Sequence, residues 1–369
     1  MRPTKIIISG GGTGGHIFPA IAIANALKRR EPACEILFVG AEGRMEMEKV
    51  PAAGYKIVGL KISGIQRGSI LKNLSLPFKI IGSLGKAMSL LAQFKPDVVV
   101  GVGGYASGPL LFAASVKNIP YLIQEQNSYA GITNKWLGKK ASKICVAFDD
   151  MDKFFPSLRI LKTGNPVRKE VVDVADKHAL GAELLKLDPS KKTILVTGGS
   201  LGAGTLNKSI EKHIQEIVDQ DIQLVWQTGK YYYAGILERL GVNFHPNVRI
   251  LEFLNRMDLA YATADVIISR AGAGTIAELC LVKKPVILVP SPNVAEDHQT
   301  KNAMALAKNN AAIIVVDRSA EDTLVKTTLE LLNDKKRCEE LSLNIGTMAL
   351  PKADELIATE VFKLAEKRK

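Results

Sequence analysis

The stretch ISGGGTGGH (residues 8–16) lies between the apolar run KIII and a pattern of apolar residues at helical spacing over residues 17–30. Its glycines at positions 10, 12 and 15 follow the order G-x-G-x-x-G. Such glycines let the backbone approach a phosphate, and the first turn of the next helix offers N–H groups to it. The stretch therefore predicts a strand, a glycine loop and a helix, the opening unit of many nucleotide-binding α/β domains.

An apolar run followed by a glycine loop and a helical pattern occurs twice more, at TGGSLGAG (residues 197–204) and at SRAGAGTIAEL (residues 269–279). Around these loops, apolar runs alternate with helical patterns in both halves of the chain. The runs are KIIIS, CEILFVG, YKIVGLKI, PDVVVGVGG, PYLIQEQ and SKICVAF, then TILVTGG, IQLVWQTG, VRILEF, ADVIISRAG, PVILVPSP and AAIIVVD. Strands that alternate with helices form parallel sheets, so the sequence predicts two Rossmann-like, doubly wound α/β domains in tandem.

The join between the two domains is expected near LKTGNPVRKE (residues 161–170), where Gly-Asn-Pro interrupts regular structure. We place the first domain at residues 1–165 and the second at 166–350. The last helix, 351–369, is expected to pack back on the first domain. Ligands in such folds bind beyond the carboxyl ends of the strands, and two such domains that face each other would form a deep cleft.

Positive charge is concentrated in the first domain. Residues 1–165 carry 22 Lys and Arg against 10 Asp and Glu, whereas residues 166–369 carry 27 of each. A basic surface attracts nucleic acid, anionic lipid or anionic substrates. The segment 70–95 combines Leu71, Phe78 and Ile81 with Lys72 and Lys79 and contains no acid, which is typical of a segment lying on anionic lipid. The alternative is an amphipathic helix that faces the core and exposes a basic side.

Metal and disulfide chemistry are not expected. The four cysteines lie far apart without C-x-x-C spacing, which favours reduced thiols in a cytosolic protein. Asp150 and Asp152 form a D-x-D pair of the kind that holds a divalent metal in some sugar-nucleotide enzymes, but we interpret this one as a solvated loop. Neither a secretory signal nor a membrane span is expected.

His16 is the first candidate for chemistry. It lies in the first turn of the helix after the glycine loop, where a base could project from a rigid backbone. Its imidazole would titrate near pH ~6.5 if unperturbed. The alternative is a histidine that helps to cap the helix.

The third glycine loop offers groups for a nucleotide diphosphate. Arg270 can neutralise the diphosphate, and the backbone amides of residues 273–275 can surround it. Glu278, one turn into the helix, can accept two hydrogen bonds from a ribose diol, although a solvated helix glutamate is the alternative. In the second loop, Ser200 could donate its hydroxyl to a phosphate, or the loop could be a tight turn without a ligand.

Two further loops of the first half follow predicted strands, at residues 101–109 and 124–136. Their polar groups suit the hydroxyls of a sugar, although each alone would pass for ordinary turn chemistry. The candidates in these loops, which the family resemblance described next places on the acceptor side, are Gly103, Gly104, Tyr105, Ser107 and Glu125.

These motifs, in this order and over the whole length, resemble the MurG family of bacterial cell-wall glycosyltransferases. The resemblance rests on GGGTGGHIFPA, RMEMEKVP, KPDVVVGVGGYASGP, EQNSYAGITNKWL, TGNPVR, GGSLGAGTLN, SRAGAGTIAEL and DHQTKNA. Members have the two-Rossmann architecture called GT-B. They move N-acetylglucosamine, with inversion and without a cofactor or metal, from UDP-N-acetylglucosamine to lipid-linked MurNAc-pentapeptide (lipid I). The product, lipid II, serves peptidoglycan synthesis and thereby cell shape and cell division.

The resemblance also implies which residues hold the donor. The family's pattern falls on Thr13, Gly14, Gly15, Asn127, Arg168, Ser200, Leu254, Ala273, Gly274, Thr275, Ile276, Ala277, Glu278 and Gln299. Among these, Glu278 would hold the ribose, the backbone of Leu254 would meet the uracil, and Gln299 would touch the donor sugar. The chain departs from many relatives in having Gln124 where they have histidine. It also has Gln299 alone, beside His298, where they have two glutamines.

The resemblance implies a peripheral enzyme on the cytoplasmic side of the inner membrane. Its partners would be the donor, lipid I, anionic lipid and candidate proteins of a cell-wall synthesis complex, but no nucleic acid. Two other interpretations follow from the residues alone. A dinucleotide-dependent (NAD) oxidoreductase would use the first glycine loop with Glu42 as its ribose-binding acid. A basic nucleic-acid-binding protein would use the charge of the first domain.

Overall fold

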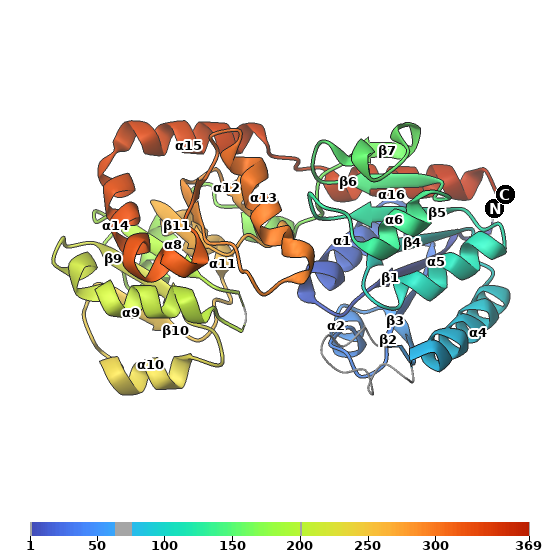
Figure 1. Ribbon diagram of the computed structural model, residues 1–369, viewed down its shortest axis with the longest axis horizontal. Helices are drawn as coiled ribbons and strands as arrows, with labels where there is room; N and C mark the ends of the chain where they lie inside the picture. Colours follow the sequence, from blue (N-terminus) through green and yellow to red (C-terminus); the bar gives the residue numbers. More distant parts are fainter. Residues whose placement is uncertain (1, 63–75, 200, 369) are drawn as a thin grey trace. The chain divides into compact units, whose positions relative to one another are not determined.

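The computed structural model describes residues 2–62, 76–199 and 201–368. Its contacts divide the chain into two compact units, Met1–Val167 together with Pro351–Lys369, and Arg168–Leu350. In Figure 1 the C-terminal helix, drawn in red, lies among the elements of the first unit. Each unit is an α/β domain with its own sheet and its own core.

The first unit is built on a seven-stranded parallel sheet with the order β3-β2-β1-β4-β5-β6-β7 (Figure 1). Its strands are β1 (Lys5–Gly10), β2 (Glu35–Ala41), β3 (Lys56–Leu60), β4 (Val98–Gly103), β5 (Tyr121–Glu125), β6 (Lys143–Val146) and β7 (Ile160–Lys162). Because β1 pairs with both β2 and β4, the strand order reverses between β1 and β4. This reversal is the point at which doubly wound sheets bind ligands.

Helices cover both faces of this sheet. They are α1 (Gly14–Arg30), α2 (Glu46–Ala52), α4 (Leu76–Phe94), α5 (Ser107–Val116), α6 (Ile132–Gly138) and α16 (Ala353–Glu366). Successive residues of β1 point to opposite faces, so Ile6 and Ile8 pack in a core with α1 and α16, whereas Ile7 packs in a core with α4, α5 and α6. The C-terminal helix is thus an integral part of the first unit.

The second unit has a six-stranded parallel sheet with the order β10-β9-β8-β11-β12-β13. Its strands are β8 (Thr193–Thr197), β9 (Gln223–Gln227), β10 (Val248–Leu251), β11 (Val266–Ser269), β12 (Val286–Leu288) and β13 (Ile313–Ile314). Its helices are α7 (Lys169–Val172), α8 (His178–Leu185), α9 (Gly204–Val218), α10 (Tyr233–Leu240), α11 (Met257–Thr263), α12 (Ala273–Val282), α13 (His298–Ala307), α14 (Ala320–Asn333) and α15 (Lys335–Thr347). Here the strand order reverses between β8 and β11, the two strands that end in the second and third glycine loops.

The prediction of two Rossmann-like parallel-sheet domains is confirmed, and every apolar run predicted as a strand contains one. Strand β7 was not predicted from the sequence, because it lies at the edge of the sheet and its two apolar side chains are only partly buried. The first helix begins at Gly14, three residues before the predicted start, because Gly12 turns the chain with a φ of +83°. Within the described ranges no helix is long and apolar enough to cross a membrane.

Candidate functional site

His16 is held by the glycine loop that precedes it. Its Nδ1 lies 3.0 Å from the carbonyl oxygen of Gly11 and 3.2 Å from Oγ1 of Thr13. A carbonyl oxygen only accepts, so Nδ1 carries the proton and, in the neutral ring, the lone pair lies on Nε2. The loop thus fixes the tautomer expected of a base that works through Nε2.

The loop after β4 packs directly on the first glycine loop. A Cβ at Gly104 would lie 2.4 Å from the Gly11 carbonyl oxygen, and one at Gly103 would lie 2.6 Å from Cδ2 of His16. Both glycines also have positive φ, 108° and 92° for Gly103 and Gly104. Only glycine fits at these positions, so the backbone of this loop forms one wall beside the His16 ring.

The other residues predicted on the acceptor side divide into two groups. Tyr105 is exposed, whereas Ser107 is buried, with its Oγ 2.8 Å from the Gly103 carbonyl oxygen. Glu125 is also buried and accepts hydrogen bonds from the backbone N–H of Gly131 (3.2 Å) and from Nδ2 of Asn134 (2.8 Å). Burial raises the pKa of the Glu125 carboxyl. Ser107 and Glu125 therefore shape the two loops from inside.

Gln124, the position where this chain departs from many relatives, is fully buried. Its Nε2 donates to Oδ1 of Asn165 at 2.8 Å, and Nδ2 of Asn165 donates to the carbonyl oxygen of Gln126 at 2.9 Å. The amide side chains thus tie the end of β5 to the segment that leaves the first unit.

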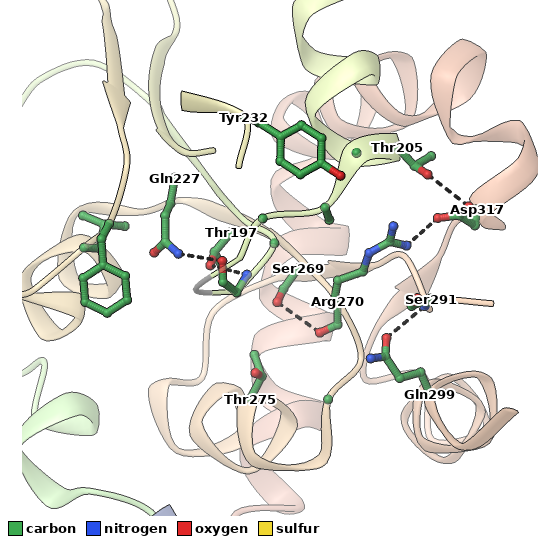
Figure 2. A pocket seen from close by; sticks show the side chains of 18 of the residues that line it. Thr197, Thr205, Gln227, Tyr232, Ser269, Arg270, Thr275, Ser291, Gln299 and Asp317 are labelled. Carbon is green, nitrogen blue, oxygen red and sulfur yellow. Dashed lines mark hydrogen bonds and ion pairs between the residues drawn. The ribbon is translucent and has the colours of Figure 1, made fainter. Parts of the chain in front are cut away.

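The second unit contains a pocket of about 990 Å³ at the carboxyl ends of its strands, within the range typical of small-molecule sites (Figure 2). The second and third glycine loops form two of its sides. The helices that follow, α9 and α12, begin at the pocket. Their N-cap residues, Ala203 and Gly272, have no capping side chain, and neither first turn contains an acid. Two positive helix ends therefore face the pocket, which favours an anionic ligand such as a diphosphate.

Glu278 lies on α12 and lines this pocket. The hydroxyl of Tyr261, on α11, donates to its Oε2 at 3.2 Å. Burial raises the pKa of Glu278, while the charge of Arg168 and the Tyr261 hydrogen bond act in the opposite direction. Its environment differs from that of a solvated helix glutamate, because Tyr261, which orients the carboxylate, is itself 1% exposed.

Arg270 also lines the pocket but forms an ion pair. Its Nη1 contacts Oδ1 of Asp317 and donates to the carbonyl oxygen of Val289 at 2.9 Å. Oδ2 of Asp317 accepts from the hydroxyl of Thr205, in the first turn of α9, at 3.1 Å (Figure 2). Arg270 thus links the β11–α12 loop to the start of α9, and the carboxylate of Asp317 balances part of its charge.

This ion pair should stabilise the second unit. Asp317→Ala leaves the Arg270 side chain, 14% exposed, without its carboxylate, so the free energy of unfolding should fall by about 3 kcal/mol. Asp322→Ala is the matched control, because it breaks an exposed pair with Lys212 and should cost less than about 1 kcal/mol. Urea unfolding of both variants measures the difference. Equal losses in the free energy of unfolding would show that the pair of Arg270 and Asp317 is no more stabilising than the exposed pair.

The remaining predicted donor residues fall in both units. Leu254, Thr275, Gln299 and Arg168 line the pocket of the second unit. Oε1 of Gln299 accepts from the backbone N–H of Ser291 at 2.9 Å. The backbone run 273–278 forms the first turns of α12. Ser200 lies outside the described residues. Thr13, Gly14, Gly15 and Asn127 belong to the first unit.

Three residues that contact predicted site residues or the first glycine loop were not themselves predicted from the sequence. Tyr261 and Asp317 orient predicted residues, and Glu46 binds the first glycine loop from α2. Each acts on a residue at least 17 positions away in the chain, and a local motif contains no sign of such a partner. The stretch RMEMEKVP, which contains Glu46, contributed to the family resemblance but was given no role.

Comparison with known proteins covers both units. The model of the glycosyltransferase family 28 N-terminal domain matches residues 6–146, and that of the family 28 C-terminal domain matches residues 193–357. A protein of Parabacteroides distasonis is 54% identical over 100% of both chains, and one of Bacteroides thetaiotaomicron is 54% identical over 99% of both. Both are named UDP-N-acetylglucosamine–N-acetylmuramyl-(pentapeptide) pyrophosphoryl-undecaprenol N-acetylglucosamine transferase.

Two solved structures share the fold of this chain over nearly its whole length. The crystal structure of Acinetobacter baumannii MurG superposes with a TM-score of 0.79 at 29% identity, covering 98% of this chain and 100% of that one. A UDP-GlcNAc 2-epimerase from Neisseria meningitidis, 17% identical with a TM-score of 0.70 over 98% of this chain and 100% of its own, shares the fold. The family models, the full-length relatives and the MurG structure show that the chain belongs to glycosyltransferase family 28 and, within it, to the MurG family.

Proposed function

We propose that the chain is an inverting glycosyltransferase that moves N-acetylglucosamine from UDP-N-acetylglucosamine to lipid I and so forms lipid II for peptidoglycan. The observation that carries the proposal is the 54% identity, over the whole chain, to transferases named for this reaction. The pocket of the second unit, with two helix N-termini and a half-buried carboxylate, supports it physically. The oxidoreductase and nucleic-acid-binding interpretations have no support among the relatives.

The second unit, in this proposal, is the donor domain. The ribose diol donates to Glu278, which Tyr261 orients, and the diphosphate lies against the starts of α9 and α12. The backbone of Leu254 meets the uracil, and Gln299 meets the sugar. Arg270 holds the two loops together through Asp317 and adds a partly balanced positive charge near the leaving diphosphate.

The first unit, in this proposal, supplies the base. Nε2 of His16 takes the proton of the acceptor hydroxyl as its oxygen forms a bond to the anomeric carbon of the donor sugar. The bond from that carbon to the diphosphate oxygen breaks, and its electron pair leaves with UDP. A single displacement of this kind inverts the anomeric configuration. Helix dipoles at the donor site stabilise the charge that develops on the diphosphate.

Donor selectivity separates the proposed function from its rivals. Titration calorimetry should show binding of UDP-N-acetylglucosamine that is at least about tenfold tighter than binding of UDP-glucose, with no heat from NADH. Preference for NADH would favour the oxidoreductase. Salt-sensitive binding of DNA or RNA without donor binding would favour the nucleic-acid interpretation.

We further propose that the first unit docks peripherally on anionic lipid at the cytoplasmic side of the inner membrane, where the lipid of the acceptor resides. Large apolar side chains are exposed on two helices that each contact α5: Phe78 (78%) and Ile81 (69%) on α4, and Trp136 (59%) on α6. These helices pack with α5 on one face of the sheet, since they share an apolar core. Exposed Lys139 and Lys140 follow α6 directly. Apolar side chains beside lysines are typical of a lipid-binding surface. Residues 70–75 of the segment predicted to lie on lipid are outside the described part.

Vesicle sedimentation tests the docking surface. Lys139→Glu with Lys140→Glu should lower binding to phosphatidylglycerol vesicles more than tenfold, because each lysine near anionic lipid contributes about 1 kcal/mol. Phe78→Ser with Ile81→Ser should also weaken binding. Salt at 0.5 M should suppress binding, because it shortens the Debye length to ~3–8 Å and so screens the attraction between the lysines and the lipid. Leu343→Ser, an equally exposed apolar site on α15, is the control. Unchanged sedimentation of both double variants would place the membrane contact elsewhere.

A further inference from the structure

Glu46, at the start of α2, is a buried carboxylate that binds the first glycine loop. Its side chain is enclosed, with the residue only 1% exposed. Oε2 accepts a hydrogen bond from the backbone N–H of Gly12 at 2.8 Å, and Oε1 accepts one from the N–H of Ala41 at 3.0 Å. A Cβ added at Gly11 or Gly40 would lie 2.2 Å or 2.6 Å from the Glu46 side chain. The carboxylate therefore fills the space beneath the loop.

In a dinucleotide-binding domain, the N–H groups of such a loop hold the diphosphate of the ligand. Here an N–H of the loop already holds an anion that belongs to the chain itself. This internal carboxylate explains why a G-x-G-x-x-G loop between a strand and a helix need not bind a nucleotide. Glu42, the acid that an NAD enzyme would require, is instead paired with Lys86 at 3.1 Å.

The contacts of Glu46 lead directly to His16. Oε2 holds Gly12, and the preceding carbonyl, that of Gly11, accepts the Nδ1 proton of His16. The Gly11 N–H in turn donates to the carbonyl oxygen of Gly103 at 3.3 Å, so the loop is fixed from two sides. Loss of the Glu46 contact would let the Gly11–Gly12 peptide rotate, and the Gly11 carbonyl would no longer define the tautomer of His16.

We infer that Glu46 is a positioning residue, which takes the place of a phosphate in the first glycine loop and thereby holds His16 with its lone pair on Nε2. The inference rests on the proposed function in one respect only, that His16 is the base. Its structural part concerns the tautomer of His16 and can be measured without turnover.

The first measurement is ¹⁵N NMR of the full chain labelled at histidine. The chain has five histidines, and the signals of His16 are identified as those that are missing from the spectrum of His16→Ala. In the unsubstituted protein, Nδ1 of neutral His16 should be protonated and Nε2 unprotonated. In Glu46→Gln, which preserves size but offers only one acceptor oxygen, the two tautomers should mix. Glu48→Gln, an exposed glutamate on the same helix, is the matched control and should change nothing.

The second measurement is a double-mutant cycle in the transfer reaction. Glu46→Gln should lower kcat about tenfold and leave the donor KM within about twofold. In a His16→Ala background the same substitution should have almost no further effect on kcat, because Glu46 influences kcat only through His16. If Glu46→Gln fails to give folded protein, Glu46→Asp, which keeps the charge but shortens the reach, replaces it with the same expectations.

An unchanged His16 tautomer in Glu46→Gln would overturn the inference, and so would an equal loss of kcat with and without His16. Failure of the proposed base looks different. His16→Ala would then retain turnover, while the NMR signals of His16 would still depend on Glu46.

Discussion

Replacing His16 with alanine should lower kcat by about 10²–10⁴ and leave donor affinity unchanged. The imidazole is held by Gly11 and Thr13 in the loop after β1, with its lone pair on Nε2. The proposed donor pocket, in contrast, is lined entirely by residues 168–321 of the second unit. In the proposed mechanism, His16→Ala therefore removes an interaction made in the transition state and no contact with the bound donor.

Steady-state kinetics and UDP calorimetry on the same variant separate the two quantities. His178→Ala, an exposed histidine on α8, is the control and should behave like the unsubstituted chain. Near-normal turnover of His16→Ala at neutral pH would return His16 to a capping role at the start of α1.

Glu278→Ala should weaken UDP binding by about 10- to 150-fold, because the bidentate interaction of a carboxylate with the ribose diol is worth about 1.5–3 kcal/mol in all. The carboxylate lines the pocket and is oriented by Tyr261. Glu183→Ala, at an exposed position on α8, is the matched control. Unchanged UDP affinity in folded Glu278→Ala would show that Glu278 does not bind the ribose.

The pH dependence of UDP binding gives a second test of Glu278. The ionised carboxylate is the form that accepts two hydroxyl protons, and burial raises its pKa above the ordinary value of 4.5. UDP affinity should therefore fall, as the pH is lowered, already at a pH above that value. Glu278→Gln should bind weakly at every pH and lose this dependence. Calorimetry over the range from pH 5 to pH 8 compares the two.

The architecture was predictable because its signals are local. Short apolar runs and the glycine loops at their ends occur within single stretches of sequence, and β7 was missed because only two of its residues, Ile160 and Leu161, are apolar. The direction of polar side chains was less accessible. Ser107 and Glu125 were expected to face an acceptor, but they turn inward to bind neighbouring backbone. The sequence shows which polar side chains a loop contains, but it does not show which of them form hydrogen bonds within the fold.

Partners distant in the chain were not predictable at all. Glu46 binds Gly12 across 34 positions, and Asp317 binds Arg270 across 47. Their meeting depends on which strands are neighbours in the sheet. Arg270 could be assigned to a diphosphate from its place in a glycine loop, but the carboxylate that balances its charge becomes visible only in the folded unit.

Analysis of the reaction products tests the proposed transfer. The full chain is incubated with UDP-N-acetylglucosamine labelled in the sugar and with lipid I bearing a short, soluble lipid. The products should be equimolar UDP and a lipid-linked disaccharide with inverted configuration at the anomeric carbon, read from the coupling constant of the anomeric proton. His16→Ala should reduce the amount of this product, and Glu48→Gln should not. Folded protein that binds UDP but forms no disaccharide, or that forms one with retained configuration, would show that the chain does not catalyse this inverting transfer.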